Sequence, residues 1–316
     1  MAKKNKKIED TFFDEIIGTQ DKDGNLIEPS QEEIDKMKEF IEERRKNMLP
    51  EQKLRLKNLS LRYQAEDEEQ KSGEKKKNNP LATVSDVVNM LGRNTLSKEY
   101  KVLDLFCGGG GVSMGLYLAG ASKVTGVDIK EEPEYPSLTS EDFTFIQADA
   151  TKFDMDFLRQ FDFIWASPPC QSYTFASARW RNLGKTYPDL VEPTRNMLLE
   201  SGVPFCMENV ITAPLRKDLT LCGEMFGIKV IRHRIFEISG FKARQPTHIP
   251  HRGSVKQGHY VTVAGHGGDG KASLKAWQDA MQIHWMKNKK TLAESIPPVF
   301  SRYILEEFFR ERGETL

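Results

Sequence analysis

Short apolar runs alternate with helix-compatible segments between residues 100 and 210, and this alternation constrains the fold more than any other feature of the chain. The predicted strands are 101–106, 123–129, 143–149, 161–166 and 204–210. The predicted helices are 112–119, 151–159 and 189–201. Strands that alternate with helices form βαβ units, so we predict an α/β fold with a mostly parallel sheet. Ligands of such sheets bind beyond the carboxyl ends of the strands, where we expect the functional residues.

A glycine-rich segment follows the first predicted strand. It reads Asp104-Leu105-Phe106-Cys107-Gly108-Gly109-Gly110-Gly111, and its glycines let the backbone approach a ligand closely. The dinucleotide pattern G-x-G-x-x-G fails here, and the chain has no G-K-[ST] of a P-loop. Asp128 ends the second strand and Asp149 ends the third, where they could accept from ribose hydroxyls and from an exocyclic amine. The three strand ends predict a nucleoside site.

The fourth predicted strand runs directly into Ser167-Pro168-Pro169-Cys170-Gln171-Ser172. The two prolines favour extended backbone and present Cys170 rigidly at the strand end. The fifth strand carries Glu208 inside an apolar run, and a buried carboxylate costs free energy unless it is paired or needed. Downstream, Arg232 and Arg234 share a face if their segment is extended. The chain thus offers a candidate nucleophile, an acid and two cations.

In order and approximate spacing, the segments 104–111, 168–171, 208–210 and 232–234 resemble the C5-cytosine DNA methyltransferases. The resemblance covers roughly residues 100–312, and Pro-Pro-Cys-Gln with Glu-Asn-Val is its most specific part. The surrounding segments 189–193 and 221–227 look like a branch common in phage and bacterial genomes. The resemblance implies a Rossmann-like sheet of the S-adenosylmethionine-dependent methyltransferases, with S-adenosyl-L-methionine as cofactor.

The resemblance also implies a reaction. A Cys170 thiolate would add to C6 of a flipped-out cytosine, so that C5 can attack the methyl group. Glu208 would hydrogen-bond N3 and the exocyclic amine, while Arg234 would hold the base carbonyl or Glu208. Arg232 would support the same pocket, and the polar stretch 171–185 would close over the base. The residues expected to contact the target are Gln171, Ser172 and Asn209.

The same resemblance implies a set of cofactor-binding residues. Asp128 would bind the ribose and Asp149 the adenine amine, with Phe106 and Ile129 against the faces of the ring. The full expected set is Phe106, Gly108, Gly110, Asp128, Ile129, Asp149 and Pro169. Two positions depart from the family pattern: Val230 replaces a glutamine before the arginine motif, and Glu294 stands in the C-terminal cofactor motif. We therefore expect no side-chain contact from Glu294 to the cofactor.

The chain divides into four predicted parts: a charged helical extension and linker (1–80), a catalytic and cofactor-binding domain (81–238), a target-recognition region (239–290) and a segment returning to the catalytic domain (291–316). Residues 81–210 hold 11 Lys and Arg against 17 Asp and Glu, whereas residues 211–290 hold 14 against 5. This asymmetry favours a polyanionic partner. We expect double-stranded DNA, bound by a monomer. Candidate phosphate contacts are Arg244, Arg252, Lys256 and Lys271.

The four cysteines form no C-x-x-C pair, which argues against a cysteine zinc site or a disulfide framework and favours a reducing cytoplasm. We expect Cys107, Cys206 and Cys222 to be structural. No apolar run reaches membrane-spanning length, and no signal peptide is expected. The sequence also contains a loose histidine cluster, which no cysteine or carboxylate completes to a familiar ligand set, so we predict no metal. Its members are His248, His251, His259 and His266.

Three other functions remain as alternatives. The first is an RNA methyltransferase, because one branch of the family acts on transfer RNA. That branch carries a Cys-Phe-Thr tripeptide, which this chain lacks. The second is a catalytically silent DNA-binding regulator, which would be expected to have lost Cys170 or Glu208. The third, a nicotinamide enzyme, is disfavoured by the failed glycine pattern.

Overall fold

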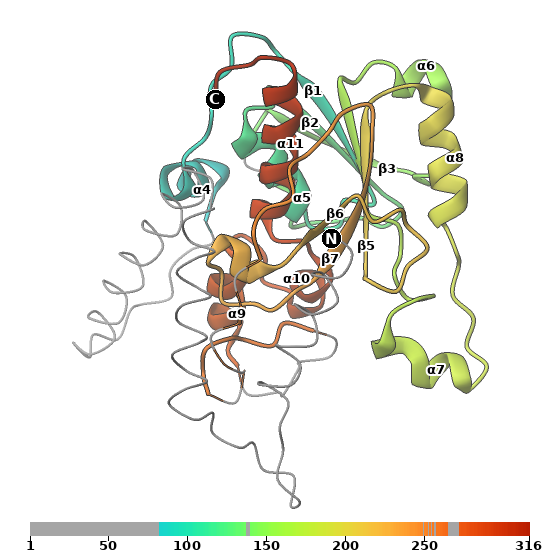
Figure 1. Ribbon diagram of the computed structural model, residues 1–316, viewed down its shortest axis with the longest axis vertical. Coiled ribbons are helices and arrows are strands. Elements are labelled where there is room, and N and C mark those ends of the chain that lie inside the picture. The colour runs from blue at the N-terminus through green and yellow to red at the C-terminus, as the bar shows by residue number, and fades with distance from the viewer. Residues whose placement is uncertain are drawn as a thin grey trace, which may run out of the picture.

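The computed structural model describes residues 82–136, 140–248, 250, 251, 253, 255, 257–264 and 272–316, so the predicted extension 1–80 lies outside the described residues. The described chain contains a seven-stranded sheet in the order β3-β2-β1-β4-β5-β7-β6 (Figure 1). The strands are β1 (Lys101–Leu105), β2 (Lys123–Asp128), β3 (Phe143–Gln147), β4 (Phe163–Ala166), β5 (Phe205–Asn209), β6 (Leu219–Leu221) and β7 (Arg234–Ser239).

The strands from β3 to β5 are parallel to one another. Strand β7 pairs antiparallel with β5 on one side and with β6 on the other. The predicted α/β fold is therefore confirmed. The chain moves outward from β1 to β2 and β3, and then returns to the other side of β1 with β4 and β5. The carboxyl ends of β1 and β4 consequently flank the point where the strand order reverses, which is where such sheets bind ligands.

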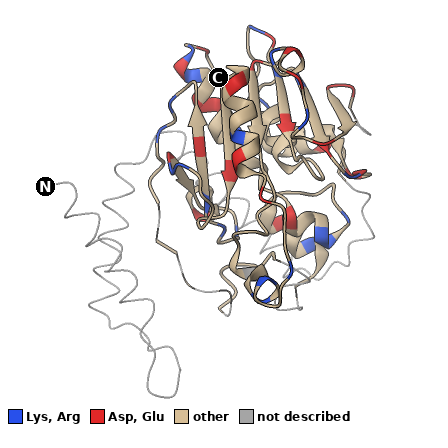
Figure 2. Cartoon of the chain, turned by 90° about the vertical axis from the view of Figure 1, so that its right-hand side faces the viewer, with Lys and Arg blue, Asp and Glu red and all other residues tan. Residues whose placement is uncertain are grey.

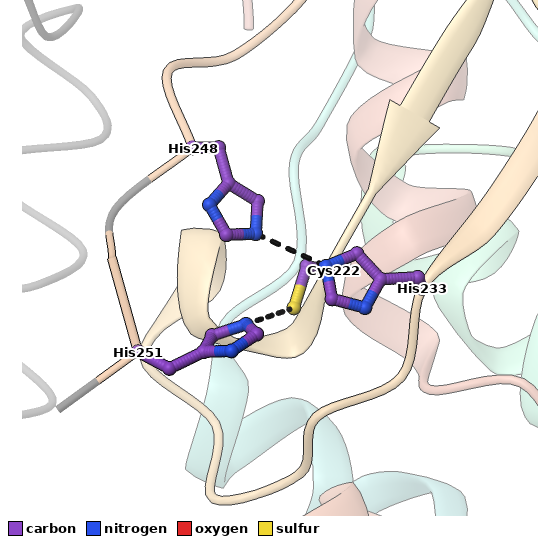
Figure 3. A group of neighbouring side chains, drawn as sticks. All are labelled: Cys222, His233, His248 and His251. Carbon is purple, nitrogen blue, oxygen red and sulfur yellow. Dashed lines mark hydrogen bonds between the residues drawn. The ribbon is translucent and has the colours of Figure 1, made fainter. Parts of the chain in front are cut away.

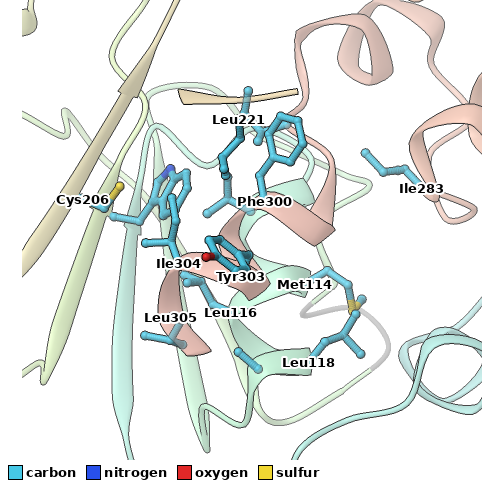
Figure 4. Close-up of a cluster of buried hydrophobic side chains, with 14 of the residues drawn as sticks. Met114, Leu116, Leu118, Cys206, Leu221, Ile283, Phe300, Tyr303, Ile304 and Leu305 are labelled. Atoms are coloured by element: carbon cyan, nitrogen blue, oxygen red, sulfur yellow. The ribbon is translucent and has the colours of Figure 1, made fainter. Parts of the chain in front are cut away.

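Helices cover both faces of the sheet (Figure 1). One face is covered by α4 (Val84–Leu91), α5 (Gly111–Ala119) and α11 (Pro298–Glu311), and the other by α6 (Met155–Leu158) and α8 (Val191–Ser201). Two apolar clusters result, because alternate strand residues point to opposite faces. Figure 4 shows the first cluster, where Met114 and Leu116 of α5 lie near Tyr303 and Ile304 of α11.

Shorter elements complete the described chain. A 3₁₀ turn η2 (Phe175–Ser177) and helix α7 (Ala178–Asn182) follow β4, and η3 (Gly223–Phe226) follows β6. Helices α9 (Leu274–Met281) and α10 (Lys289–Glu294) precede α11. Among the described residues, none of the helices has the length and apolar character needed to span a bilayer.

The C-terminal helix α11 packs directly on α5, the helix that follows the glycine-rich loop. A Cβ atom at Gly115 of α5 would lie 2.0 Å from the Pro298 carbonyl oxygen and 2.1 Å from Ser301 Oγ. The Ser301 hydroxyl donates to the Val112 carbonyl at 2.9 Å. Glycine at position 115 is thus required for the close approach that holds the end of the chain against the loop.

A buried polar chain lies beneath the glycine-rich loop. Asp104 of β1 is 0% exposed, and its Oδ2 accepts from the Ser113 hydroxyl at 2.5 Å. The Tyr135 hydroxyl donates to Ser113 Oγ at 2.9 Å. Asp104 Oδ1 has no hydrogen-bond partner among the described residues. Burial raises the pKa of Asp104 to about 8, so this carboxyl is largely protonated at neutral pH.

Asp104 should make stability fall as the pH rises. Its pKa is higher in the folded than in the unfolded chain, so the folded state binds more protons between about pH 4 and about pH 8. The free energy of unfolding should therefore decrease across this window, by up to about 1.4 kcal/mol per pH unit from this group. Asp104→Asn should remove that decrease, as measured by urea unfolding at several pH values. A wild-type-to-variant difference that stays constant with pH would refute this assignment.

Candidate active site

Cys170 lies just beyond the carboxyl end of β4, as its sequence position predicts. The connecting residues are held on both sides: the Ser167 amide donates to the Leu105 carbonyl of β1 at 3.1 Å. The Asn209 side-chain amide of β5 donates to the Pro168 carbonyl at 2.9 Å. Because Pro168 and Pro169 themselves restrict the backbone, the half-buried Cys170 thiol has a fixed position between two strand ends.

Glu208 is a buried acid in β5, the strand that pairs with β4. It is 5% exposed, and its Oε1 is 2.8 Å from Nε of Arg234 at the start of β7. The antiparallel pairing of β5 with β7, in which Glu208 pairs with Phe236, brings the two side chains together. Burial raises the pKa of Glu208, and this effect is opposed by Arg234, Arg232 and a hydrogen bond from Ser167. A carboxyl in this balance can either donate a proton or carry charge.

The Cys170 thiol is held in its protonated form by its surroundings. Burial and the Glu208 carboxylate raise its pKa, whereas Arg234 and Arg232 act in the opposite direction. The thiol is therefore not an exposed, permanently ionised nucleophile. Its proton must leave as a substrate enters, which protects the resting thiol from side reactions.

Arg232 is fixed by the C-terminal part of the chain. It is 8% exposed; its Nη2 donates to the Ala293 carbonyl at 2.6 Å, and its Nη1 lies 3.7 Å from Met281 Sδ. Burial and Arg234 lower its pKa to about 9, with Glu208 and Cys170 opposing that shift. Arg232 thus connects the pocket to α9 and α10, while Arg234 alone makes the direct ion pair with Glu208 among the described residues.

Gln171 and Ser172 begin the loop that carries η2 and α7. The Ser172 hydroxyl is directed to the carbonyls of Tyr187 and Pro188, at 3.1 and 3.2 Å. The Gln171 carbonyl accepts from Arg181 Nη1 at 2.8 Å. The loop extends away from the sheet and places α7 apart from the other helices (Figure 1). It exposes three large apolar side chains, namely Phe175 (78%), Trp180 (52%) and Leu183 (69%).

Asn209, an expected target contact, is buried and engaged within the protein. It is 1% exposed, its amide nitrogen holds Pro168, and its Oδ1 accepts from the Val210 amide at 2.9 Å. Both polar atoms of the side chain are therefore used to join the ends of β4 and β5. In this arrangement Asn209 acts on the site by positioning the segment that carries Cys170.

The glycine-rich loop beyond β1 faces open space. Gly108 adopts a φ of +47°, and a Cβ atom there would meet nothing within 4 Å. Gly110 adopts a φ of +82°, and a Cβ there would lie 2.5 Å from Pro136. Phe106 also adopts a positive φ, of 62°. The backbone thus turns sharply beyond β1 and leaves a cradle on one side, as close approach of a cofactor requires.

Asp128, at the end of β2, is joined to this loop. Its Oδ2 accepts from the Gly108 amide at 3.0 Å, and its Oδ1 accepts from the Lys130 amide at 3.1 Å. The next residue, Ile129, is 65% exposed. A carboxylate beside a glycine turn, followed by an exposed apolar side chain, suits a ribose next to a base. Together with the open face of Gly108, these residues fit the expected cofactor.

Asp149, the third expected acid, is bound to its own turn. Its Oδ1 accepts from the amide and the hydroxyl of Thr151, at 3.0 and 2.7 Å, and its Oδ2 lies 3.1 Å from Lys152 Nζ. These bonds, chiefly that of the Thr151 hydroxyl, lower the pKa of Asp149 to about 2. The carboxylate is therefore charged, and a ligand amine would have to share it with Thr151 and Lys152.

Sequence reasoning did not identify Glu132. This half-buried acid has its pKa raised to about 7 by burial, and then by the charges of Asp128 and Glu294. The Tyr135 ring packs over Gly126, where a Cβ atom would lie 2.5 Å from the ring. Because the ring fills this space, the segment that carries Glu132 turns back. In the sequence the only signal for this turn is Tyr135, and a single tyrosine does not predict a turn.

The ends of β1, β2, β4 and β5 thus combine a nucleoside cradle with a cysteine and a buried acid, which defines a methyltransferase that uses S-adenosyl-L-methionine. Residues 100–212 match the family model "C-5 cytosine-specific DNA methylase". The match ends before Arg232 and Arg234. Comparison of the sequence with curated proteins finds no match.

Solved structures with a similar fold include three methyltransferases of low sequence identity. A protein encoded within an E. coli prophage, described as a DNA modification methyltransferase, is 15% identical, with a TM-score of 0.46 over 68% of this chain and 100% of its own. The S. pombe Dnmt2 methyltransferase is 15% identical, with a TM-score of 0.45 over 67% and 99%. The Entamoeba histolytica methyltransferase EhMeth is 12% identical, with a TM-score of 0.46 over 68% and 99%.

Asp128→Ala should weaken cofactor binding. The change removes the acceptor of the Gly108 amide and the expected ribose partner. Hydrogen bonds to a charged group contribute about 1.5–3 kcal/mol, so the dissociation constant for S-adenosyl-L-methionine should rise by roughly 10–150-fold. Isothermal titration calorimetry measures this, with Glu131→Gln as a control on the same loop. An affinity equal to that of the control would show that Asp128 does not hold the cofactor.

Proposed function

We propose that this protein transfers a methyl group from S-adenosyl-L-methionine to carbon 5 of cytosine in double-stranded DNA. The observation that carries the proposal is the grouping of Cys170, Glu208 and Arg234 at neighbouring strand ends, beside the glycine-rich cradle of β1. A thiol next to a buried acid and a cation suits addition to an electron-poor ring. The proposed catalytic residues are Cys170, Glu208, Arg232 and Arg234.

In the proposed reaction the Cys170 thiol loses its proton and its sulfur forms a bond to C6 of the cytosine. Glu208, whose pKa is raised, donates a hydrogen bond or a proton to N3, where the displaced electron pair would otherwise build negative charge. Bound S-adenosyl-L-methionine supplies the electrophilic methyl group that C5 attacks. Loss of the C5 proton to water, with any N3 proton returned to Glu208, gives the electron pair that expels Cys170 as a thiolate, which then takes a proton from water.

Arg234 has two roles in this scheme. Its Nε holds Glu208 at 2.8 Å, and its Nη1 donates to the His233 carbonyl at 2.9 Å, which fixes the guanidinium relative to its own backbone. It thereby orients Glu208, and its positive charge offsets the negative charge that develops in the base. Arg232 supports this arrangement through the Ala293 carbonyl, so the backbone at Ala293 contributes to the pocket.

The target base would have to leave the duplex to reach Cys170. The loop from Gln171 to α7 offers the means, because it begins at the nucleophile and exposes Phe175 and Trp180. Exposed apolar and aromatic side chains can fill or stack against a vacated base position, at a cost of a few kcal/mol for unstacking. Arg179 and Arg181 also lie on α7, and cations on this helix can approach DNA phosphates.

Of the four candidate phosphate contacts, the structure describes only Arg244. Arg244 is bound to Glu307 at 2.7 Å, so its charge is already compensated by the protein. The other three, Arg252, Lys256 and Lys271, lie outside the described residues. In the described part, acidic and basic residues are interspersed over the helices and loops (Figure 2). Charge along the sequence therefore supports a polyanionic partner less directly than the loop at α7 does.

Methyl transfer to matched substrates tests the proposal. Labelled S-adenosyl-L-methionine is offered with mixed-sequence duplex DNA, the same sequence as single-stranded DNA, and total transfer RNA. We expect label in the duplex, located at C5 of cytosine by bisulfite sequencing. Label only in RNA would establish the RNA methyltransferase instead. Cofactor and DNA binding without transfer to any substrate would favour the silent regulator.

A further inference from the structure

Four potential metal ligands converge on one point outside the catalytic pocket (Figure 3). They are Cys222, His233, His248 and His251, and one ligand atom from each lies within 4.8 Å of the others. Cys222 Sγ is 3.4 Å from His251 Nε2, and His233 Nε2 is 3.1 Å from His248 Nε2. Cys222 is buried, and the three histidines are half-buried.

These separations match those of a tetrahedral zinc site. Zn–N bonds of about 2.0–2.1 Å and a Zn–S bond of about 2.3 Å place two nitrogen ligands roughly 3.3 Å apart, and a nitrogen and a sulfur roughly 3.6 Å apart. The observed separations of 3.1 Å and 3.4 Å differ from these values by about 0.2 Å, which small side-chain movements supply. The other ligand-atom separations are no more than 4.8 Å, which is within about 1–1.5 Å of the tetrahedral values.

We propose that Cys222, His233, His248 and His251 bind one zinc ion. A thiolate with imidazoles in a tetrahedral arrangement selects zinc over calcium or magnesium, which prefer oxygen ligands. Four protein ligands leave no open coordination position, so the ion is structural and not catalytic. The proposal concerns a site separate from the methyl-transfer residues and does not depend on which nucleic acid is methylated.

The chemistry of the four side chains supports the assignment. Three imidazole nitrogens and one cysteine sulfur are donors of the kinds that zinc prefers. The Cys222 sulfur is buried, and the backbone amides of Glu224, Arg232 and Gly223 are directed at it. Amide groups directed at a sulfur are the kind of outer-shell support that stabilises a bound thiolate.

The zinc ion would join three separate parts of the chain. Cys222 follows β6, His233 immediately precedes β7, and His248 and His251 lie beyond β7 in the region predicted to recognise the target. Here the sequence argument that no cysteine completes the histidine set is wrong. The fold brings Cys222 and His233 to His248 and His251, whereas His259 is not in the group and His266 lies outside the described residues.

The position of His233 gives the site a consequence for the active site. His233 lies between Arg232 and Arg234, and its carbonyl accepts from Arg234 Nη1 at 2.9 Å. An ion that holds the His233 ring therefore holds the segment from which Arg234 reaches Glu208. Zinc would position this ion pair and anchor the start of the region beyond β7, without contacting the base.

The alternative is a purely hydrogen-bonded cluster. Pairs of the type N–H···N and S–H···N account for the two short separations. Two such hydrogen bonds do not require the two pairs to lie near each other. A shared ion does require it, and all four ligand atoms lie within 4.8 Å of one another. The two possibilities differ in metal content, so they can be separated by experiment.

The test uses the full chain without a histidine tag, purified and dialysed without chelator. Elemental analysis should find about one zinc per chain. After exchange, cobalt should show the visible absorption of a tetrahedral site together with a thiolate-to-cobalt charge-transfer band. Cys222→Ser should abolish the charge-transfer band. Chelator competition should give zinc affinities more than about 100-fold weaker for Cys222→Ser and for His248→Ala, since even outer-shell losses cost 10–100-fold.

His259→Ala, an exposed histidine outside the group, is the matched control and should retain wild-type zinc content. If the wild-type chain neither retains zinc nor binds it more tightly than Cys222→Ser, the proposal is overturned and the hydrogen-bonded cluster stands. Stoichiometric zinc that persists unchanged in both ligand variants would equally overturn it, because the ion would then lie elsewhere. Neither result depends on methyl-transfer activity.

Discussion

Replacing Cys170 with alanine should lower methyl transfer to duplex DNA by about 10⁴-fold or more, because no other group can then form the bond to C6. The thiol lies beyond β4 between two fixed strand ends, and Ala at this position fits the same backbone. The variant should therefore fold and bind S-adenosyl-L-methionine as the wild type does. Single-turnover transfer of labelled methyl and calorimetric cofactor binding measure the two properties separately.

Cys206→Ala is the matched control for this experiment. Cys206 lies in β5, two residues before Glu208, and is 0% exposed within the apolar cluster shown in Figure 4. Its loss removes a thiol from the core without removing the proposed nucleophile. Transfer by Cys170→Ala at a rate within about tenfold of that of Cys206→Ala would rule out covalent catalysis by Cys170.

Glu208→Gln should lower the rate of transfer by about 10²–10⁴-fold, the range typical for loss of a general acid or base. Glutamine keeps the size of the side chain but can neither donate a carboxyl proton to N3 nor pair with Arg234 as an ion. Because Glu208 is not part of the cofactor cradle, the affinity for S-adenosyl-L-methionine should change little. Pre-steady-state transfer with saturating cofactor isolates the chemical step.

Glu237→Gln controls for the stability cost of breaking a buried ion pair. Glu237 lies in β7, is 3% exposed, and pairs with Arg195 at 2.7 Å. Its replacement should destabilise the same sheet, because losing one partner of a buried pair costs about 3–5 kcal/mol. Transfer per folded molecule should nevertheless remain near wild type. If Glu208→Gln and Glu237→Gln lose activity equally, Glu208 has only a structural role.

The strand ends were predictable because two local signals coincide there. Apolar runs mark β1, β2, β4 and β5, and an unusual residue or motif lies at or just beyond the end of each: the glycines follow β1, Asp128 ends β2, the prolines and Cys170 follow β4, and Glu208 lies near the end of β5. In a parallel sheet such ends share one edge, so sequence order alone brings Cys170 near Glu208. The ion pair of Glu208 with Arg234 needed one further fact, the antiparallel pairing of β7 with β5.

Other features depend on contacts between distant segments, which a single sequence does not reveal. The bond of Arg232 to Ala293 spans 61 positions, and that of Arg244 to Glu307 spans 63. Cys222 and His251 meet because the segment beyond β7 runs back beside β6, where the Gln245 side chain bonds the backbone of Thr220. Their spacing matches no familiar zinc motif, so the ligand set was missed although two of its histidines had been noticed.

The most direct test of the account is to trap the proposed covalent adduct. Wild-type protein is incubated with S-adenosyl-L-methionine and a mixed-sequence duplex in which 5-fluorocytosine replaces cytosine. Fluorine at C5 cannot leave as a proton, so the enzyme should stay bonded to C6 after methyl transfer. Peptide mapping by mass spectrometry should then find the methylated nucleotide on Cys170. An absence of adduct under conditions that support methylation of ordinary duplex DNA, or an adduct on another residue, would contradict the account.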